Sequence, residues 1–262
     1  MNRKKYTFDD LIEIMAKLRG PDGCPWDREQ THESLKRHML EETYEALEAI
    51  EAGDDEMMKE ELGDVLLQIV FHGRIGEEDG RFDTSDIVDG ICRKLIERHT
   101  HVFGEDIAKD PEAVLKNWDR IKNKSKGLQS HTEKINAIPK TYPALLRSLK
   151  IQEKAAKAGF DWDDPEGAID KTMEEIGEFM EACRKRDRQS IKDEMGDLLF
   201  SLVNVCRFMD IEPEITLQET SDRFTRRFAY IEENVKKTGR KMEDMTLAEL
   251  DRFWDMAKEE GL

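Results

Sequence analysis

The fold of this chain is decided by residues 40–71, which read LEETYEALEAIEAGDDEMMKEELGDVLLQIVF. This stretch holds two groups of acids, Glu41-Glu42-x-x-Glu45 followed by Glu61-x-x-Asp64. The same pattern recurs later in the chain as Glu174-Glu175-x-x-Glu178 and Glu194-x-x-Asp197. In both copies, 19 positions separate the second glutamate of the first group from the first acid of the second group. A repeat of this length indicates two copies of one structural unit.

The spacing of the acids predicts that they lie side by side on helices. Residues three apart share one helical face, so Glu42 and Glu45 form one pair and Glu61 and Asp64 form another. At about 100° per residue, the second pair shares a narrow polar stripe with Gln68 and His72, and apolar residues cover the rest of that helix. The second copy repeats the stripe with Glu194, Asp197, Ser201 and Asn204.

A helix that is apolar nearly all round is expected to be buried. Carboxylates on it need a partner, because a buried charge without one is very costly. A cation shared with the glutamates of the preceding helix would supply that partner. The alternative is an ordinary solvated face, which is the usual fate of acidic runs on helices. The recurrence at matched spacing favours the cation site.

Basic and aromatic residues also recur at matched places. Singly, such residues most often form solvated faces or core. Together, and in the same order in both halves, they are typical of a site for metal and polyphosphate, in which basic side chains hold phosphates and a tryptophan stacks on a base. The first half has Lys94, Arg98, Trp118 and Lys122, and the second has Arg223, Arg227, Trp254 and Lys258.

Composition limits the possible partners and the compartment. The net charge of −17 over 262 residues argues against nucleic acid or an anionic membrane as the main partner. The four cysteines are scattered, as expected for reduced thiols of a cytoplasmic protein. We also expect no signal peptide and no membrane span, since no apolar run approaches the required length.

The chain is expected to be all-α, because no segment alternates convincingly with period two. We predict two tandem helical-bundle repeats, residues 1–123 and 144–262, joined by a polar linker at 124–143 with Gly127, Pro139 and Pro143. The loop at 24–27 and caps at Thr84, Ser190 and Thr246 punctuate the helices. Helices are predicted at 8–19, 33–52, 55–78, 85–99, 111–124, 144–158, from 165, from 190, at 214–237 and from 246.

The sequence resembles the MazG family of all-α nucleoside triphosphate pyrophosphohydrolases. The resemblance rests on the two sets of acids, on Gly23-Cys24-Pro25-Trp26-Asp27 and on Arg98-His99-x-His101-Val102-Phe103, and it covers nearly the whole chain. It implies Mg²⁺-dependent hydrolysis of nucleoside triphosphates (NTPs) to monophosphate and pyrophosphate, and a homodimer. Arg223 departs from the family, which often has lysine at this position.

The resemblance also implies roles for particular residues. The implied Mg²⁺ ligands are Glu175, Glu178, Glu194 and Asp197, with Glu42, Glu45, Glu61 and Asp64 as their counterparts in the first copy. The residues implied to line the nucleotide are Lys171, Glu174, Arg223, Arg227, Trp254 and Lys258. Glu41 and Glu174, each one residue before a ligand, are candidates for water activation or for support of the ligands.

Two other classes of protein are considered. A di-iron oxidase would also carry helix carboxylates, but it needs a Glu-x-x-His motif, which this pattern lacks. A non-catalytic helical regulator would use the acids only as a solvated face. Within the pyrophosphohydrolase hypothesis, we expect the second copy to bind NTP more tightly, because Lys171 stands where the first copy has His38, which is mostly neutral near pH 7.

Overall fold

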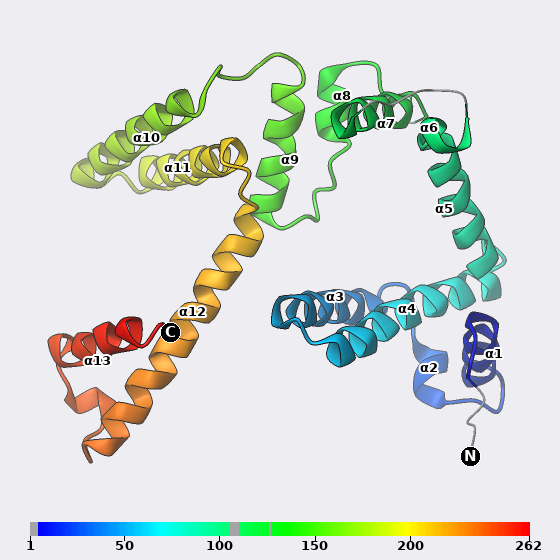
Figure 1. Ribbon diagram of the computed structural model, residues 1–262, viewed down its shortest axis with the longest axis horizontal. Coiled ribbons are helices and arrows are strands. Elements are labelled where there is room, and N and C mark those ends of the chain that lie inside the picture. Colours follow the sequence, from blue (N-terminus) through cyan, green and yellow to red (C-terminus); the bar gives the residue numbers. More distant parts are fainter. Residues whose placement is uncertain (1–4, 105–109, 126) are drawn as a thin grey trace. The chain divides into compact units, whose positions relative to one another are not determined.

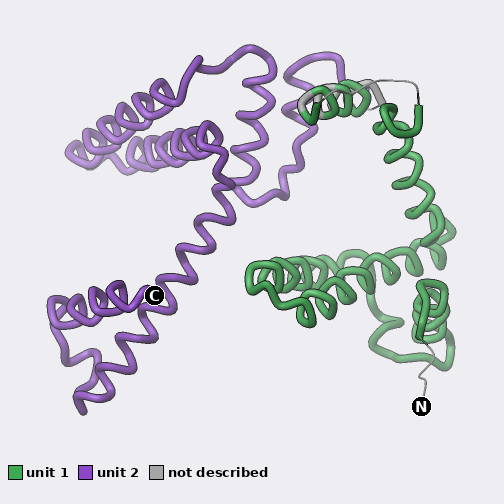
Figure 2. Tube along the Cα trace, in the orientation of Figure 1, with its two compact units in different colours: residues 1–122 green, residues 123–262 purple. Residues whose placement is uncertain are grey.

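A computed structural model describes residues 5–104, 110–125 and 127–262, and these residues form helices and no strand. This confirms the all-α prediction. The chain divides into two compact units, Met1–Lys122 (unit 1) and Asn123–Leu262 (unit 2), shown in Figure 2. None of the described helices is both long enough and apolar enough to cross a bilayer.

Unit 1 is built around a helical hairpin, α3 and α4 (Figure 1). Gly53, in the left-handed conformation at φ 63°, ends α3, and the Asp54 side chain accepts the backbone N–H groups of Glu56 and Met57 to start α4. Helix α1 packs on α4. The core of the unit contains Met15, Leu35, Val70, Phe71 and Ile75. The helices are α1 (Phe8–Leu18), α2 (Pro25–Glu29), α3 (Leu35–Ala52), α4 (Asp55–Glu78), α5 (Thr84–Arg98), α6 (Thr100–Phe103) and α7 (Pro111–Ser125), which continues past the end of the unit at Lys122.

Unit 2 contains a second hairpin of the same kind, formed by α10 and α11. Arg186, at φ 55°, makes the turn, and the Asp187 side chain caps α11. Helix α9 packs on α11, α12 packs on α9, and α13 packs on α12. The elements are α8 (His131–Asn136), α9 (Ala144–Ala156), α10 (Pro165–Lys185), α11 (Arg188–Phe208), α12 (Pro213–Lys237), the 3-10 turn η1 (Met242–Asp244) and α13 (Leu247–Glu259).

Several local predictions differ from the structure. The segment predicted as a linker contains α8, which Ser130 and Glu133 start with a capping box and which packs on α9. Helix α5 is capped by Asp83 and begins at Thr84, and Asp187 takes the role that was predicted for Ser190. The predicted loop at 24–27 overlaps the short helix α2, which spans Pro25–Glu29. The predicted capping box at Thr246 is confirmed.

The prediction that both ExxD helices are buried nearly all round is wrong. Leu62 on α4 is 51% exposed and Leu199 on α11 is 48% exposed. The first buried residues of the two helices, Gln68 and Ser201, stand about one turn beyond the acids, and Leu202 next to Ser201 is still 44% exposed. The reason is that each hairpin meets a third helix of its unit, α1 or α9, only along part of its length. The ExxD acids therefore stand on half-covered helices.

Candidate functional site

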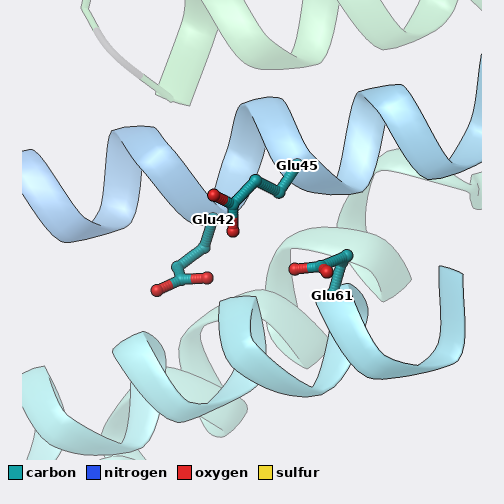
Figure 3. A group of neighbouring side chains, drawn as sticks. All are labelled: Glu42, Glu45 and Glu61. Carbon is teal, nitrogen blue, oxygen red and sulfur yellow. The ribbon is translucent and has the colours of Figure 1, made fainter. Parts of the chain in front are cut away.

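Three carboxylates converge between α3 and α4 in unit 1. Glu42 and Glu45 on α3 face Glu61 on α4, as Figure 3 shows, and one carboxylate oxygen from each lies within 4.8 Å of the others. These three residues are called the first acid cluster. Asp64 is outside this group of oxygens, although its charge acts on two of the members.

The first acid cluster is electrostatically strained as it stands. Partial burial, followed by the charges of Asp64 and Glu45, raises the pKa of the Glu42 carboxyl above its ordinary value. Partial burial and the charges of Glu45 and Asp64 also raise the pKa of Glu61. Because like charges at this distance resist ionisation, a cation placed among them would be strongly attracted.

Unit 2 has a second acid cluster at the matching place between α10 and α11. It consists of Glu175, Glu194 and Asp197, whose ligand oxygens also lie within 4.8 Å of one another. Glu178 lies outside this group, but after burial its charge contributes most to raising the pKa of Glu194. In each unit the structure thus brings together three of the four predicted ligands and keeps the fourth within electrostatic range.

The surroundings of the two clusters differ in fixed positive charge. In unit 2, the Lys171 ammonium lies 2.7 Å from a Glu175 oxygen and 2.9 Å from a Glu174 oxygen. Both contacts, that with Glu175 foremost, raise the pKa of Lys171, so this side chain stays charged. In unit 1, the basic neighbours Arg37 and His38 contact Glu41, at 2.7 and 3.4 Å. Only unit 2 therefore pairs a lysine directly with a member of its acid cluster, among the described residues.

The chemistry of the donors fits a hard divalent cation. Each cluster offers carboxylate oxygens only, and Mg²⁺ and Ca²⁺ prefer oxygen ligands. Cys92, Cys183 and the histidines take no part in either group. Glu175 is 6% exposed, and a buried carboxylate beside other carboxylates is the arrangement that a bound cation would stabilise.

The predicted basic and tryptophan residues come together in pairs in each unit. In unit 1, the Arg98 guanidinium lies 4.8 Å and the Lys122 ammonium 5.0 Å from the centre of the Trp118 ring, while Lys94 is exposed. In unit 2, the Arg227 guanidinium lies 5.2 Å from the Trp254 ring centre. The predicted basic residues of unit 2 also make polar contacts. Arg227 donates to the Leu262 carbonyl, Arg223 donates to the Thr220 hydroxyl, and Lys258 pairs with Asp255.

A cavity of about 450 Å³ opens beside the second acid cluster. Lys171, Glu175 and Asp197 form one part of its wall, and side chains of α9, α10, α11 and the loop at 160–162 form the rest. The wall does not include Arg223, Arg227, Trp254 or Lys258, which lie on α12 and α13. Their role in binding the nucleotide therefore stays a prediction.

Some residues of this cavity were not singled out from the sequence. Gln152 lies on the buried side of α9, 6% exposed, and its side-chain N–H donates to the Phe200 carbonyl at 2.8 Å. Arg207 pairs with Asp161 across the loop, at 2.9 Å for one of its two contacts. A signal for Gln152 exists, because it follows Leu145 and Leu149 at helical spacing and is the polar member of that apolar stripe.

Comparisons with known proteins agree with this arrangement. The model of the MazG nucleotide pyrophosphohydrolase domain matches the chain twice, at residues 30–103 and 164–236, and each match contains one acid cluster. The nucleoside triphosphate pyrophosphohydrolase/pyrophosphatase MazG of Thermotoga maritima is 46% identical over 98% of both chains. The nucleoside triphosphate pyrophosphohydrolase of Escherichia coli is 40% identical over 97% of this chain and 98% of its own.

A further relative, the uncharacterised protein YabN of Bacillus subtilis, is 48% identical over 97% of this chain and 52% of its own length. The two domain matches cover both helical hairpins, and the matches to the Thermotoga and Escherichia proteins run through nearly the whole of both chains. The chain therefore belongs to the MazG nucleotide pyrophosphohydrolase family.

Proposed function

We propose that this protein hydrolyses nucleoside triphosphates to nucleoside monophosphate and pyrophosphate, with Mg²⁺ held by the second acid cluster. The observation that carries the proposal is the position of Glu175 and Asp197, two members of the second acid cluster, at the wall of a cavity that also presents Lys171. A bound Mg²⁺ supplies charge neutralisation on the phosphates and a water that is easier to deprotonate. Its ligands are Glu175, Glu194 and Asp197, with Glu178 as a fourth.

Lys171 is proposed to receive the triphosphate. Its ammonium is held at the edge of the acid cluster by Glu174 and Glu175, and it stays protonated because these carboxylates raise its pKa. With Glu175 bound to a cation, the Lys171 ammonium would be available to pair with a phosphate oxygen.

Glu174 is proposed to accept the proton of the attacking water. In the reaction, the water oxygen forms a bond to the α-phosphorus, the bond from that phosphorus to the bridging oxygen breaks, and pyrophosphate leaves with the electron pair. Glu174 is more exposed than Glu175, and its carboxylate lies 2.9 Å from the Lys171 ammonium, which also contacts Glu175 of the second acid cluster. Glu41 is its counterpart in unit 1.

The quaternary structure and compartment are further parts of the proposal. Leu199, Phe200 and Leu202 on α11 are each more than 40% exposed, and such apolar surface supports a homodimer. Cys24, Cys92, Cys183 and Cys206 are free thiols, which fits a reducing cytoplasm. Arg223, Arg227, Trp254 and Lys258 are proposed to contribute to nucleotide binding from α12 and α13.

The products of the reaction test the proposal. With ATP and Mg²⁺, the protein should release AMP and pyrophosphate, as measured by chromatography of the nucleotides and by an assay for pyrophosphate. The matched control is Glu194→Gln, which removes one carboxylate charge of the cluster and should abolish both products. ADP and orthophosphate as the first products would overturn the proposal, as would full activity of the Glu194→Gln variant.

A further inference from the structure

The cavity of unit 2 has the properties of a pocket for an organic group. Its volume of about 450 Å³ falls in the range of small-molecule sites. Ala155, Ala168 and Phe200 give it apolar walls, and Trp162 stands at its side. The Trp162 ring lies against the α-carbon of Gly167 on α10, at a place where a Cβ atom would collide with the ring. Packing against this glycine therefore fixes the position of the Trp162 ring.

We propose that this cavity receives the nucleobase of the triphosphate, an inference that rests on the proposed function. The base would enter between Trp162 and the alanines of α9 and α10, while the triphosphate stays at Lys171 and the second acid cluster. The base and the triphosphate would then contact the same cavity wall, because Glu175 and Asp197 line the cavity together with Trp162 and the alanines.

Gln152 supplies the strongest sign of a ligand. Its amide N–H donates to the Phe200 carbonyl, which can only accept, so the orientation of the amide is settled. The other end of the amide, Oε1, is buried and has no hydrogen-bond partner among the described residues. An acceptor buried without a partner is costly, and this one lies on a residue of the cavity wall. A ring N–H or an exocyclic amino group of a base would satisfy it.

Asn204 offers the complementary group. Its Oδ1 accepts the Nε–H of Arg207 at 2.9 Å, which directs the amino end of the amide away from Arg207. Asp161 holds the Arg207 guanidinium from the loop, so Asn204 is oriented by a chain of two contacts. Gln152 and Asn204 thus place an unpartnered acceptor and a second oriented amide on residues of the wall, and every common base carries both a donor and an acceptor on its edge.

The matching positions in unit 1 carry larger side chains. Ala168 stands seven residues before Glu175, and Leu35 stands seven before Glu42. Ser201 and Gln68 each stand four residues after the aspartate of the ExxD motif. Leu35 is 1% exposed and packs with Met15 in the core, and Gln68 on α4 is 5% exposed. Unit 1 therefore puts core side chains at positions where unit 2 lines its cavity.

This difference gives the test. Ala168→Leu and Ser201→Gln, made separately, introduce into unit 2 the residues that unit 1 carries. Binding of Mg²⁺-ATP and of Mg²⁺ with inorganic triphosphate is measured by calorimetry in the full chain, at a common pH and salt concentration. The wild type should bind ATP more tightly than inorganic triphosphate. Ala168→Leu and Ser201→Gln, called the filled variants, should each lose most of the preference for ATP over inorganic triphosphate. Their affinity for inorganic triphosphate should stay at the wild-type value.

A third variant tests the inference independently, in case the two filled variants misfold. Gln152→Met keeps the length of the side chain and removes the acceptor, and it should weaken ATP binding by roughly tenfold, the value of one lost hydrogen bond in a buried site. Its affinity for inorganic triphosphate should not change. Helical content by circular dichroism confirms that each variant is folded.

The outcomes separate this inference from the proposed function. If the folded variants keep the wild-type preference for ATP, or if the wild type shows none, the base does not enter this cavity. Because the readout is binding, it holds whether or not the protein releases pyrophosphate. A wild type that prefers ATP, loses the preference in the filled variants and yet forms no AMP would refute the proposed reaction alone.

Discussion

Unit 1 and unit 2 set three carboxylates at the same place on the same kind of helical hairpin, yet the surroundings of these acids differ. In unit 1, the neighbouring core is filled by Met15 and Leu35, and the nearest basic groups contact Glu41. In unit 2, a cavity adjoins the acids and Lys171 contacts Glu175. The difference teaches that the acids alone describe a place for a cation, whereas a place for a nucleotide also needs space and fixed positive charge.

The largest expected effect comes from removing a carboxylate of the second acid cluster. Asp197→Asn should lower NTP hydrolysis by roughly 10²–10³, the range seen when one preorganised charged or polar group of an active site is lost. The equivalent Asp64→Asn in unit 1 should lower it much less. Steady-state rates with ATP and Mg²⁺ measure both. If the two variants lose hydrolysis rate equally, the two acid clusters contribute equally to the reaction and the proposed difference between the units is wrong.

Glu178→Gln sharpens the same comparison within unit 2. Glu178 lies outside the closest oxygens of the cluster, so its loss should weaken Mg²⁺ binding less than the loss of Asp197 does. The metal-free variant should be no less stable than the wild type, because the charge of Glu178 raises the pKa of Glu194 and so opposes its ionisation. Calorimetric titration with Mg²⁺ and thermal unfolding check both statements. An unfolded Glu178→Gln variant would make this residue structural.

Truncation of the unit 1 core should cost stability and spare activity. Leu35→Ala removes a side chain that is 1% exposed, and such changes cost about 2–5 kcal/mol. Denaturant unfolding measures the loss, and the rate per folded molecule should match the wild type. A fall in that rate comparable to the one in Asp197→Asn would place the nucleotide in unit 1.

Two glutamates should respond to acid in opposite directions. Hydrogen bonds from Arg19 lower the pKa of Glu78 in unit 1, so its stabilising contribution is present above its unfolded pKa of about 4.5 and is lost as the pH falls through the lower folded value. Burial and neighbouring acids raise the pKa of Glu194, so its destabilising contribution is relieved as the pH falls through the folded value.

Thermal unfolding from neutral to acid pH tests this contrast. Glu78→Gln should cost about 1–3 kcal/mol at neutral pH, as expected for a hydrogen bond to a charged group, and should flatten the acid response. The stabilisation by Mg²⁺ should be greatest near neutral pH and should shrink as protons compete for Glu194. If Mg²⁺ stabilises the protein equally at every pH, the acids of the clusters are not its ligands.

Much of the fold could be predicted from the sequence because helix ends carry local signals. Gly53 and the box formed by Thr246 and Glu249 mark their helices by short-range chemistry. The predicted linker was harder, because Ser130 and Glu133 start a helix too short to show a hydrophobic period. The burial of α4 and α11 was overestimated because periodicity tells which face is apolar and not which helix covers it.

The acids were predictable and the cavity was not, for a physical reason. Spacing by three places two carboxylates on one face, and the matched repeat joins two such faces, so Glu42 and Glu61 could be placed together from the sequence. A cavity depends on small residues from several helices that meet only in the fold, such as Ala155 and Ala168. No local sequence pattern predicts that these two alanines line the same cavity.

The division of labour between the two clusters is tested most directly by nucleotide titration of Glu61→Gln and Glu194→Gln, made separately in the full chain. Each substitution removes one charge from one cluster and leaves the other cluster intact. We predict that Glu194→Gln abolishes binding of Mg²⁺-ATP and that Glu61→Gln leaves it close to the wild-type value. If Glu61→Gln abolishes ATP binding and Glu194→Gln leaves it unchanged, unit 1 is the main nucleotide site and the account is wrong.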